Sequence, residues 1–359
     1  MKKFLTILLS VMLVSGIFVS CTKEKEKETN AFLVGMVTDS GTIDDKSFNQ
    51  GTWEGILKAE KDLGIKPKYL KPVGTTEADF VKEISNLYDS GYKFIICPGF
   101  KFETAVFKAQ EKYPDAKFVL IDGNAHAADS FEPANGPNTI GITFLENESA
   151  FLAAIAAALQ VQEGIFGFIG GMEVPAVQKF NWGWQQGVMY ANEHFGTHIE
   201  LKRENIIYQG SFSDIAAGQQ IAASMYDRGV NVIHAAAGGV GVGVINEAKN
   251  RAQSGQKVWV VGVDVDQYSE GIIADGSSVV LTSAMKYLDM ASYDIIKDEL
   301  NGKFEGGRSL TLAAKNDAVG IPKNNPNLSD EVQQKVAEVF EKIKSGEITV
   351  SAQQGSLFR

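Results

Sequence analysis

The pattern Phe-Asn-x-Gly-x-x-x-Gly occurs twice in the chain, as FNQGTWEG at residues 48–55 and as FNWGWQQG at residues 180–187, 132 positions later. The segments before the two copies also correspond. AFLVGMV and GIFGFIGG have the composition of buried strands, and each is followed by a loop, TDSGTIDDKS or MEVPAVQK. We expect a helix to begin at each copy, with Phe48 and Phe180 at the helix starts and the glycines packed closely on a sheet.

Two further units repeat in the same order. Tyr-Asp-x-Gly ends a helical pattern at residues 88–91 and again at 226–229, and a buried-type strand follows each time. The third unit is a helix, a turn and a strand that ends in aspartate, Asp122 in the first half and Asp264 in the second. Three strand-and-helix units in each half predict an α/β chain with two similar lobes, each a doubly wound parallel sheet with helices on both faces.

The amino-terminal segment is typical of an export signal. Residues 1–20 begin with a basic pair and continue as an apolar run that ends in FVSC at Cys21. The run is shorter than the ~20 residues that a membrane-spanning helix needs. We predict a signal peptide over 1–20, a lipid (palmitate) on Cys21, and a solvated tether over 21–30 that anchors the protein on the extracytoplasmic, periplasmic or cell-surface, face of a membrane. A plain signal peptide and an uncleaved anchor are the alternatives.

Composition limits the partners and the covalent chemistry of the chain. The net charge is -10, which argues against binding to a nucleic acid polymer. The chain has two cysteines, Cys21 and Cys97. With lipid on Cys21 no disulfide is possible, and Cys97 is interpreted as a buried thiol. The apolar segment 150–161 is too short to cross a bilayer and is expected to form a core helix.

The repeats also suggest where the lobes begin and end. Lobe 1 is expected to comprise residues 31–143 and about 267–317, and lobe 2 residues 144–266 and about 318–359. Two such lobes would close on a ligand by hinge motion. The hinge crossings are expected near Gly141–Leu145, Val265–Tyr268 and Lys315–Val319.

Polar residues gather at the predicted carboxyl ends of the strands, where open parallel sheets bind ligands. These residues are Asp39, Asp122, the segment His234–Gly239 and Asp264, and Lys286 follows a further strand that ends in the same region. Carboxylates bind diol groups through charge-assisted hydrogen bonds, and aromatic side chains cover flat rings. We therefore expect a neutral ligand with hydroxyl groups and a flat ring, bound in a cleft between the lobes.

The sequence also resembles a known family. Four stretches are similar to the basic membrane lipoprotein family of substrate-binding proteins, and to its purine nucleoside receptor type: DSGTIDDKSFNQGTWEG, QGSFSDIAAGQQIAASMYDRGVNVIHAAAGGVGVGVINEAK, GVDVDQ and IKSGEITV. The resemblance extends from about Ala31 to the end of the chain. It implies a type I periplasmic-binding-protein fold. It also implies that the protein delivers a purine nucleoside, such as inosine, guanosine or adenosine, to the permease and ATPase subunits of an ABC importer. We expect no cofactor and no metal.

The resemblance assigns ligand contacts to individual residues. It implies that Phe48 stacks on the purine and that Asn49 bonds to it. His234 occupies the position of the family's second stacking aromatic, where an imidazole replaces Phe or Tyr. The remaining contacts that it implies fall on Asp39, Asp122, Asp264, Lys286, Gly238 and Gly239. Phe180 and Trp184, in the second copy of the motif, are further candidates.

Three other interpretations remain open. The ligand could be another neutral hydroxylated molecule, or the protein could act as a surface adhesin. A metal-assisted nucleoside hydrolase would use the aspartates of DD at 44–45 and DVD at 264–266, or Asp122 and Asp264 as an acid and base pair. No His/Cys/Asp cluster has the spacing of metal ligands, and a tethered chain suits capture, so we do not expect an enzyme.

Overall fold

The structure is a computed structural model that describes residues 31–358. The predicted signal segment, the lipid on Cys21 and the tether over 21–30 lie outside the described residues and remain predictions. Cys97 is described and is a fully buried free thiol, as expected, and burial raises its pKa.

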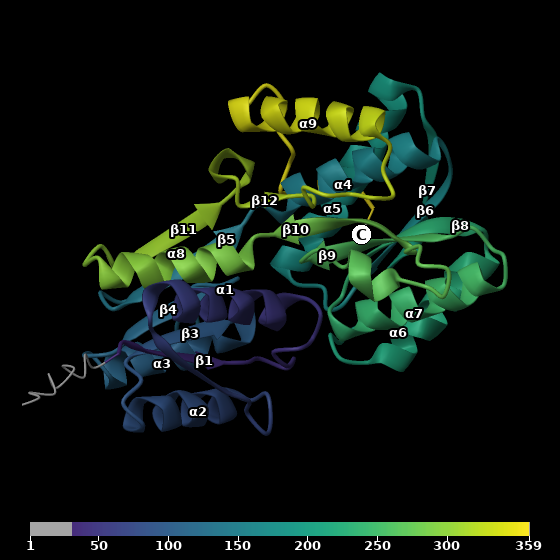
Figure 1. Cartoon of the computed structure of the whole chain (residues 1–359). Helices are drawn as coiled ribbons and strands as arrows, with labels where there is room; N and C mark the ends of the chain where they lie inside the picture. The colour runs from purple at the N-terminus through teal and green to yellow at the C-terminus, as the bar shows by residue number, and fades with distance from the viewer. Residues whose placement is uncertain (1–30, 359) are drawn as a thin grey trace, which may run out of the picture. The chain divides into compact units, whose positions relative to one another are not determined.

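The described chain contains two six-stranded sheets, and the first is entirely parallel (Figure 1). Its strand order is β11-β5-β4-β3-β1-β2. These strands are β1 (Leu33–Val37), β2 (Lys66–Leu70), β3 (Phe94–Pro98), β4 (Lys117–Ile121), β5 (Thr139–Phe144) and β11 (Arg308–Leu312).

The second sheet repeats this plan with the order β12-β10-β9-β8-β6-β7. Only its short strand β12 is antiparallel. These strands are β6 (Glu163–Gly170), β7 (His198–Tyr208), β8 (Val230–Ala236), β9 (Trp259–Asp264), β10 (Val280–Lys286) and β12 (Val319–Gly320). The predicted pair of parallel-sheet α/β lobes is confirmed.

The helices are α1 (Phe48–Leu63), α2 (Glu77–Asp89), α3 (Glu103–Lys112), α4 (Glu146–Val161), α5 (Pro175–Phe195), α6 (Ile215–Asp227), α7 (Gly239–Gln253), α8 (Leu288–Leu300) and α9 (Asp330–Ser345). Most helices connect strands of the same sheet, as parallel pairing requires, whereas α4 and α8 lie between strands of different sheets and α9 follows the last strand. Helix α4 contains the segment expected in the core, and most of its residues are buried. Within residues 31–358, no helix combines the length and hydropathy that a bilayer span requires.

The edge strands β2 and β7 were not located from the sequence. KPKYL and HIELKRENIIY are rich in charged residues and only partly buried, because each strand has a neighbour on one side alone. Their hydrophobic pattern is therefore weak, and the polar positions resemble those of a loop.

One strand lies in a different lobe from the one predicted. The sequence analysis placed residues 267–317 in lobe 1, but β10 pairs with β9 and β12 in the second sheet. β10 is almost completely buried and extends the parallel sheet beyond β9. The chain returns to the first lobe only after Lys286, where α8 packs against α1. This passage therefore follows β10 and does not lie near Val265–Tyr268.

The two copies of the glycine motif differ from expectation in their packing partners. A Cβ atom at Gly55 would lie 2.2 Å from the carbonyl oxygen of Asp289 in α8, and one at the corresponding Gly187 would lie 2.4 Å from that of Phe151 in α4. The glycines thus allow helices to touch, α1 with α8 and α5 with α4, and do not serve mainly to bring a helix onto its sheet (Figure 1).

The two motif helices also begin at different points of the pattern. Helix α1 begins at Phe48, as predicted. Helix α5 begins at Pro175, five residues before Phe180, because proline has the backbone angle of a first helical residue and needs no amide partner there. Phe180 therefore lies in the second turn of its helix and not at the helix start.

Candidate ligand-binding site

A cavity of about 470 Å³ lies where the carboxyl ends of both sheets meet. Its volume is in the range of small-molecule sites, ~300 to 1,000 Å³. The helices that follow the strands begin here, so the amino termini of α1, α5 and α7 contribute to the walls. Of the residues proposed from the sequence, the cavity is lined by Asp39, Phe48, Asn49, Asp122, Phe180, Gly238, Gly239, Asp264 and Lys286.

Asp122 and Asp264 occupy matching places in the two lobes. Asp122 directly follows β4, and Asp264 is the last residue of β9. Both have a left-handed backbone, with φ values of 59° and 65°. Such angles are uncommon outside glycine and asparagine and often occur at functional sites. The backbone geometry thus directs one carboxylate from each lobe into the cavity.

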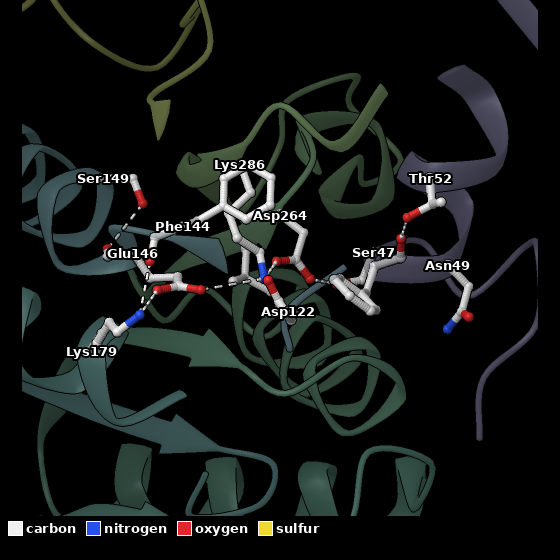
Figure 2. A network of polar contacts seen from close by, with 12 residues as sticks. Ser47, Asn49, Thr52, Asp122, Phe144, Glu146, Ser149, Lys179, Asp264 and Lys286 are labelled. Atoms are coloured by element: carbon white, nitrogen blue, oxygen red, sulfur yellow. Dashed lines mark hydrogen bonds and ion pairs between the residues drawn. The ribbon is translucent and has the colours of Figure 1, made fainter. Parts of the chain in front are cut away.

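Lys286, the last residue of β10, is the cation that these carboxylates share (Figure 2). Its Nζ is closest to Asp122 Oδ2 and lies 3.5 Å from Asp264 Oδ1 and 3.9 Å from Glu146 Oε1. The side chain is 3% exposed. Burial alone would lower the pKa of the ammonium, but the carboxylates of Asp122, Asp264 and Glu146 raise it above its usual value.

The two strand-end carboxylates differ in their hydrogen-bond and ion-pair partners. The closest partner of Lys286 is Asp122, while Asp264 Oδ2 accepts a hydrogen bond from the Ser47 hydroxyl at the start of α1. Burial raises the pKa of Asp264, and Lys286 and Ser47 oppose this shift. Asp122 Oδ1 is buried and has no partner among residues 31–358. An unsatisfied buried carboxylate oxygen beside a cavity is an acceptor for a ligand hydroxyl or amino group.

A second group of carboxylates shapes the wall of the first lobe. Asp45 accepts hydrogen bonds from the backbone amides of Ser47, Asn49 and Gln50 and so caps α1. The side-chain amide of Asn49 donates to Asp39 Oδ1 at 2.9 Å and to Asp45 Oδ2 at 2.8 Å. Both amide hydrogens of Asn49 are therefore used within the protein, and Asn49 positions Asp39 at the cavity.

Aromatic rings supply the apolar part of the walls. Phe48 is half-buried, and the Lys286 ammonium lies 4.7 Å from its ring centroid, in a cation–π contact. Phe212 lies on the second lobe, in the loop between β7 and α6, and its carbonyl oxygen accepts a hydrogen bond from the Gly239 amide at 2.8 Å. Flat apolar walls from both lobes suit a planar ring.

The sequence analysis missed several residues that line the cavity. They include Asp45, Ser47, Phe100, Glu103, Asn124, Phe131 and Phe212. Phe212 was detectable in principle, because it follows a strand and precedes a helix, as Phe48 does. That strand is β7, whose polar sequence hid it, so the position of Phe212 at a strand end went unrecognised.

His234 and Trp184 do not line the cavity, contrary to the prediction. Both side chains are fully buried in the core, where the His234 ring lies 5.1 Å from Trp184 and 5.8 Å from Phe180 between ring centroids. His234 lies within β8, two residues before its end, so its side chain points into the sheet–helix core. Its Nδ1 bonds to the Val261 carbonyl oxygen, and burial lowers its pKa to about 4. The imidazole is neutral and structural.

Three of the aspartates considered for catalysis lie in structural or exposed positions. Asp45 caps α1, Asp44 is exposed, and Asp266 accepts from the Tyr268 amide in a tight turn. No group of three His, Cys, Asp or Glu side chains within residues 31–358 could hold a metal ion.

Two parallel-sheet lobes with a ligand-sized cavity at their strand ends are the architecture of ABC-transporter substrate-binding proteins, as the similarity to a solved solute-binding protein shows. Members of this class collect a small ligand on the extracytoplasmic side and pass it to a permease driven by an ATPase. The chain belongs to the family of PnrA-like ABC transporter substrate-binding proteins, whose model matches residues 32–354.

Individual relatives agree with this assignment. The chain is 34% identical over 324 residues to the ABC transporter nucleoside-binding protein BmpA of Lactococcus lactis subsp. cremoris, covering 88% of each chain. It is 31% identical to basic membrane protein A of Borreliella burgdorferi, over 98% of this chain and 96% of the relative. A crystal structure of an ABC transporter solute-binding protein from Aeropyrum pernix K1 matches with a TM-score of 0.76 and 26% identity, over 90% of this chain and 94% of that one.

Proposed function

We propose that this protein binds a purine nucleoside in the cavity and delivers it to the permease and ATPase of an ABC importer. The observation that carries the proposal is the pair of strand-end carboxylates, Asp122 and Asp264, which share Lys286 beside an aromatic wall. Vicinal hydroxyls of a ribose are donors that match carboxylate oxygens, and the unsatisfied Asp122 Oδ1 offers one such acceptor.

The aromatic walls favour a ligand with a planar base. Phe48 and Phe212 come from different lobes and both line the cavity, so we assign the base to the space between them. This assignment replaces His234, which is buried behind Phe180. The edge of the base would meet Asp39, whose Oδ1 already accepts from Gly41 and Asn49 and whose Oδ2 is available.

The charge of the walls disfavours phosphorylated ligands. Within residues 31–358, five carboxylates line the cavity, those of Asp39, Asp45, Glu103, Asp122 and Asp264, against one ammonium, that of Lys286. A phosphate group would meet like charges at short range and would lose its hydration without compensation. A nucleoside is therefore preferred to the corresponding nucleotide. The nucleoside-binding name of the Lactococcus lactis relative supports the same ligand class.

Calorimetric titration tests the ligand assignment. Inosine, guanosine and adenosine should bind more tightly than free purine bases, ribose or nucleotides. Asp122→Asn should weaken nucleoside binding by at least about tenfold, because it removes the charge from the unsatisfied acceptor. Asp44→Asn is the matched control, since Asp44 is exposed and lies outside the cavity. Tighter binding of a nucleotide or a free sugar than of every nucleoside would show that the assignment is wrong.

The membrane anchor is a separate part of the proposal. FVSC at residues 18–21 follows a short apolar run and precedes a charged segment, which supports cleavage before Cys21 and its lipidation. Cys21→Ser should release the protein from the membrane fraction of cells, whereas Cys97→Ser should not. Unchanged membrane retention of Cys21→Ser would contradict lipid anchoring.

We further propose that the lobes close on the ligand by hinge motion. The chain passes between the two sheets after β5, after β10 and between β11 and β12, and these three short connections can absorb the change. The radius of gyration measured by X-ray scattering should fall when adenosine saturates the protein. An equal radius with and without adenosine, under conditions where calorimetry shows binding, would contradict closure.

A further inference from the structure

Next to the cavity lies an ion pair whose carboxylate is buried and whose ammonium is partly exposed. Glu146 is 1% exposed, and its Oε2 lies 3.0 Å from Lys179 Nζ (Figure 2). Its other carboxylate oxygen, Oε1, lies 3.9 Å from Lys286 Nζ. Neither Glu146 nor Lys179 lines the cavity. Glu146 therefore acts on the site through its charge, chiefly on Lys286, which it shares with Asp122 and Asp264.

The position of this pair in the chain connects it to the passages between lobes. Glu146 begins α4, two residues after the last residue of β5, and Lys286 ends β10. Lys179, from α5 in the second lobe, also donates to the carbonyl oxygen of Phe144, the last residue of β5, at 2.8 Å. Two of the three interlobe connections thus meet at one group of charges.

The group carries more negative than positive charge. The carboxylates of Asp122, Asp264 and Glu146 surround the two ammonium groups of Lys179 and Lys286. Glu146 and the two aspartates attract the same ammonium of Lys286. When Glu146 is ionised, it attracts the ammonium of Lys286, which then neutralises Asp122 and Asp264 less. When Glu146 is protonated, Lys286 neutralises the two aspartates more fully.

We propose that Glu146 and Lys179 form a positioning pair that sets how Lys286 is shared between Asp122 and Asp264, so that ligand affinity depends on the proton carried by Glu146. The ligand's hydroxyl donors bind more strongly to carboxylates that are less neutralised by Lys286. Ligand binding and ionisation of Glu146 then favour each other, since such coupling is reciprocal. The identity of the ligand rests on the proposed function, whereas the charge coupling does not.

The surroundings of Glu146 raise the pKa of its carboxyl group toward neutral pH. Burial raises its pKa to about 7; Lys179 and Lys286 oppose this shift, and Asp122 adds to it. These groups come from α5, from β10 and from the loop after β4, which together enclose the carboxylate. Its position in the first turn of α4 also favours the ionised form.

The first test is the pH dependence of adenosine binding between about pH 6 and 8, where the adenine base does not titrate. Wild-type affinity should rise about three- to tenfold with pH, which corresponds to a coupling of roughly 0.5 to 1 pKa unit. Glu146→Gln should bind adenosine with no such rise. Glu148→Gln is the matched control, because Glu148 lies in the same helical turn but accepts from the Ala314 amide and does not contact Lys286, and it should behave as wild type.

A flat wild-type profile, or a wild-type profile retained in Glu146→Gln, overturns the positioning role. A second measurement needs no ligand. The ¹³Cε NMR signal of Lys286 should titrate with the midpoint of Glu146 in the wild-type protein and lose that transition in Glu146→Gln. Failure of every nucleoside to bind would refute the proposed function. The NMR titration would then test the coupling alone, and the absence of a transition shared by Lys286 and Glu146 would overturn it.

Discussion

The two copies of Phe-Asn-x-Gly-x-x-x-Gly share the helix contact of their second glycine and differ in the surroundings of their phenylalanine and asparagine. Gly55 touches the backbone of α8 and Gly187 that of α4, both at distances that leave no room for a Cβ atom. Phe48, in the first copy, begins its helix and is half-buried at the cavity. Phe180, in the second copy, lies in the second helical turn and is 2% exposed.

The asparagines show the same divergence. The Asn49 side chain bonds to two carboxylates of the cavity wall, whereas Asn181 donates to the Tyr208 hydroxyl and accepts from Gln185. The glycines keep one role because helix contact is imposed by the backbone. The polar and aromatic side chains change role because the first copy faces an acidic wall and the second an aromatic core around neutral His234.

The largest expected difference between the copies is in stability. Phe180→Ala should lower the free energy of unfolding by ~3 to 5 kcal/mol, because it removes a buried ring from the core. Phe48→Ala should lower it by less, since Phe48 is only half-buried. Urea denaturation of the two variants measures both values. Equal losses would mean that the two rings are equivalent in packing.

The glycines should behave alike in the two copies. Gly55→Ala and Gly187→Ala should each lower the free energy of unfolding by about 3 kcal/mol, because the added Cβ would meet backbone atoms that cannot move independently. Gly241→Ala is the control: it also lies in a helix, but its Cβ would be 3.5 Å from the nearest atom. That variant should be neutral or slightly more stable. A mild effect at only one of the two motif positions would break the correspondence.

The second copy should also make stability depend on acid. The pKa of His234 is about 4 in the folded protein, below its usual value near 6.5, because burial disfavours the charged imidazole. The unfolded chain therefore takes up a proton first, and the native state loses roughly 3 kcal/mol of stability from this group as pH falls from about 6.5 to 4. This loss should be absent from His234→Phe when its unfolding is compared with wild type across that range.

Glu146 changes the stability of the native state with pH in the direction opposite to His234, so its variant serves as an internal control. Its folded pKa of about 7 lies above the ordinary value, so the native state binds the extra proton and its stability falls as pH rises from about 4.5 to 7. Glu146→Gln should remove this fall and leave the His234 contribution in place. A difference curve for His234→Phe that is flat, or that has the sign expected for Glu146, would contradict the buried neutral imidazole.

The smallest effect concerns binding and is expected at the first copy alone. Phe48→Ala should weaken nucleoside binding by ~1 to 3 kcal/mol, about five- to 150-fold, as for loss of a stacking ring. Trp184→Phe, in the second copy, should change affinity by less than about twofold, because Trp184 lies in the core and not at the cavity. Calorimetry compares them, and a larger effect for Trp184 would place the base on the other wall.

Much of the binding site follows a rule that sequence can express. Asp122 and Asp264 close buried runs of matching length and order, and strand ends of parallel sheets meet at one edge. Their approach to a shared cavity was therefore predictable. The prediction for His234 was wrong because this residue lies two positions before the end of β8. Ala236, the last residue of the strand, lines the cavity, whereas His234 lies in the core.

The repeated units in the sequence determined two doubly wound lobes, because buried periodicity and strand order leave few ways to cover both faces of a parallel sheet. The acidic strand ends also belong to the sequence pattern, whereas the helix partners of the glycines became clear only from the tertiary structure. The tertiary structure alone decided that Lys286 lies closest to Asp122, that Phe212 lines the second wall and that β10 joins the second sheet. These features depend on where helices begin and on which distant strands become neighbours. The local pattern of residues in the sequence specifies neither the helix starts nor the neighbouring strands.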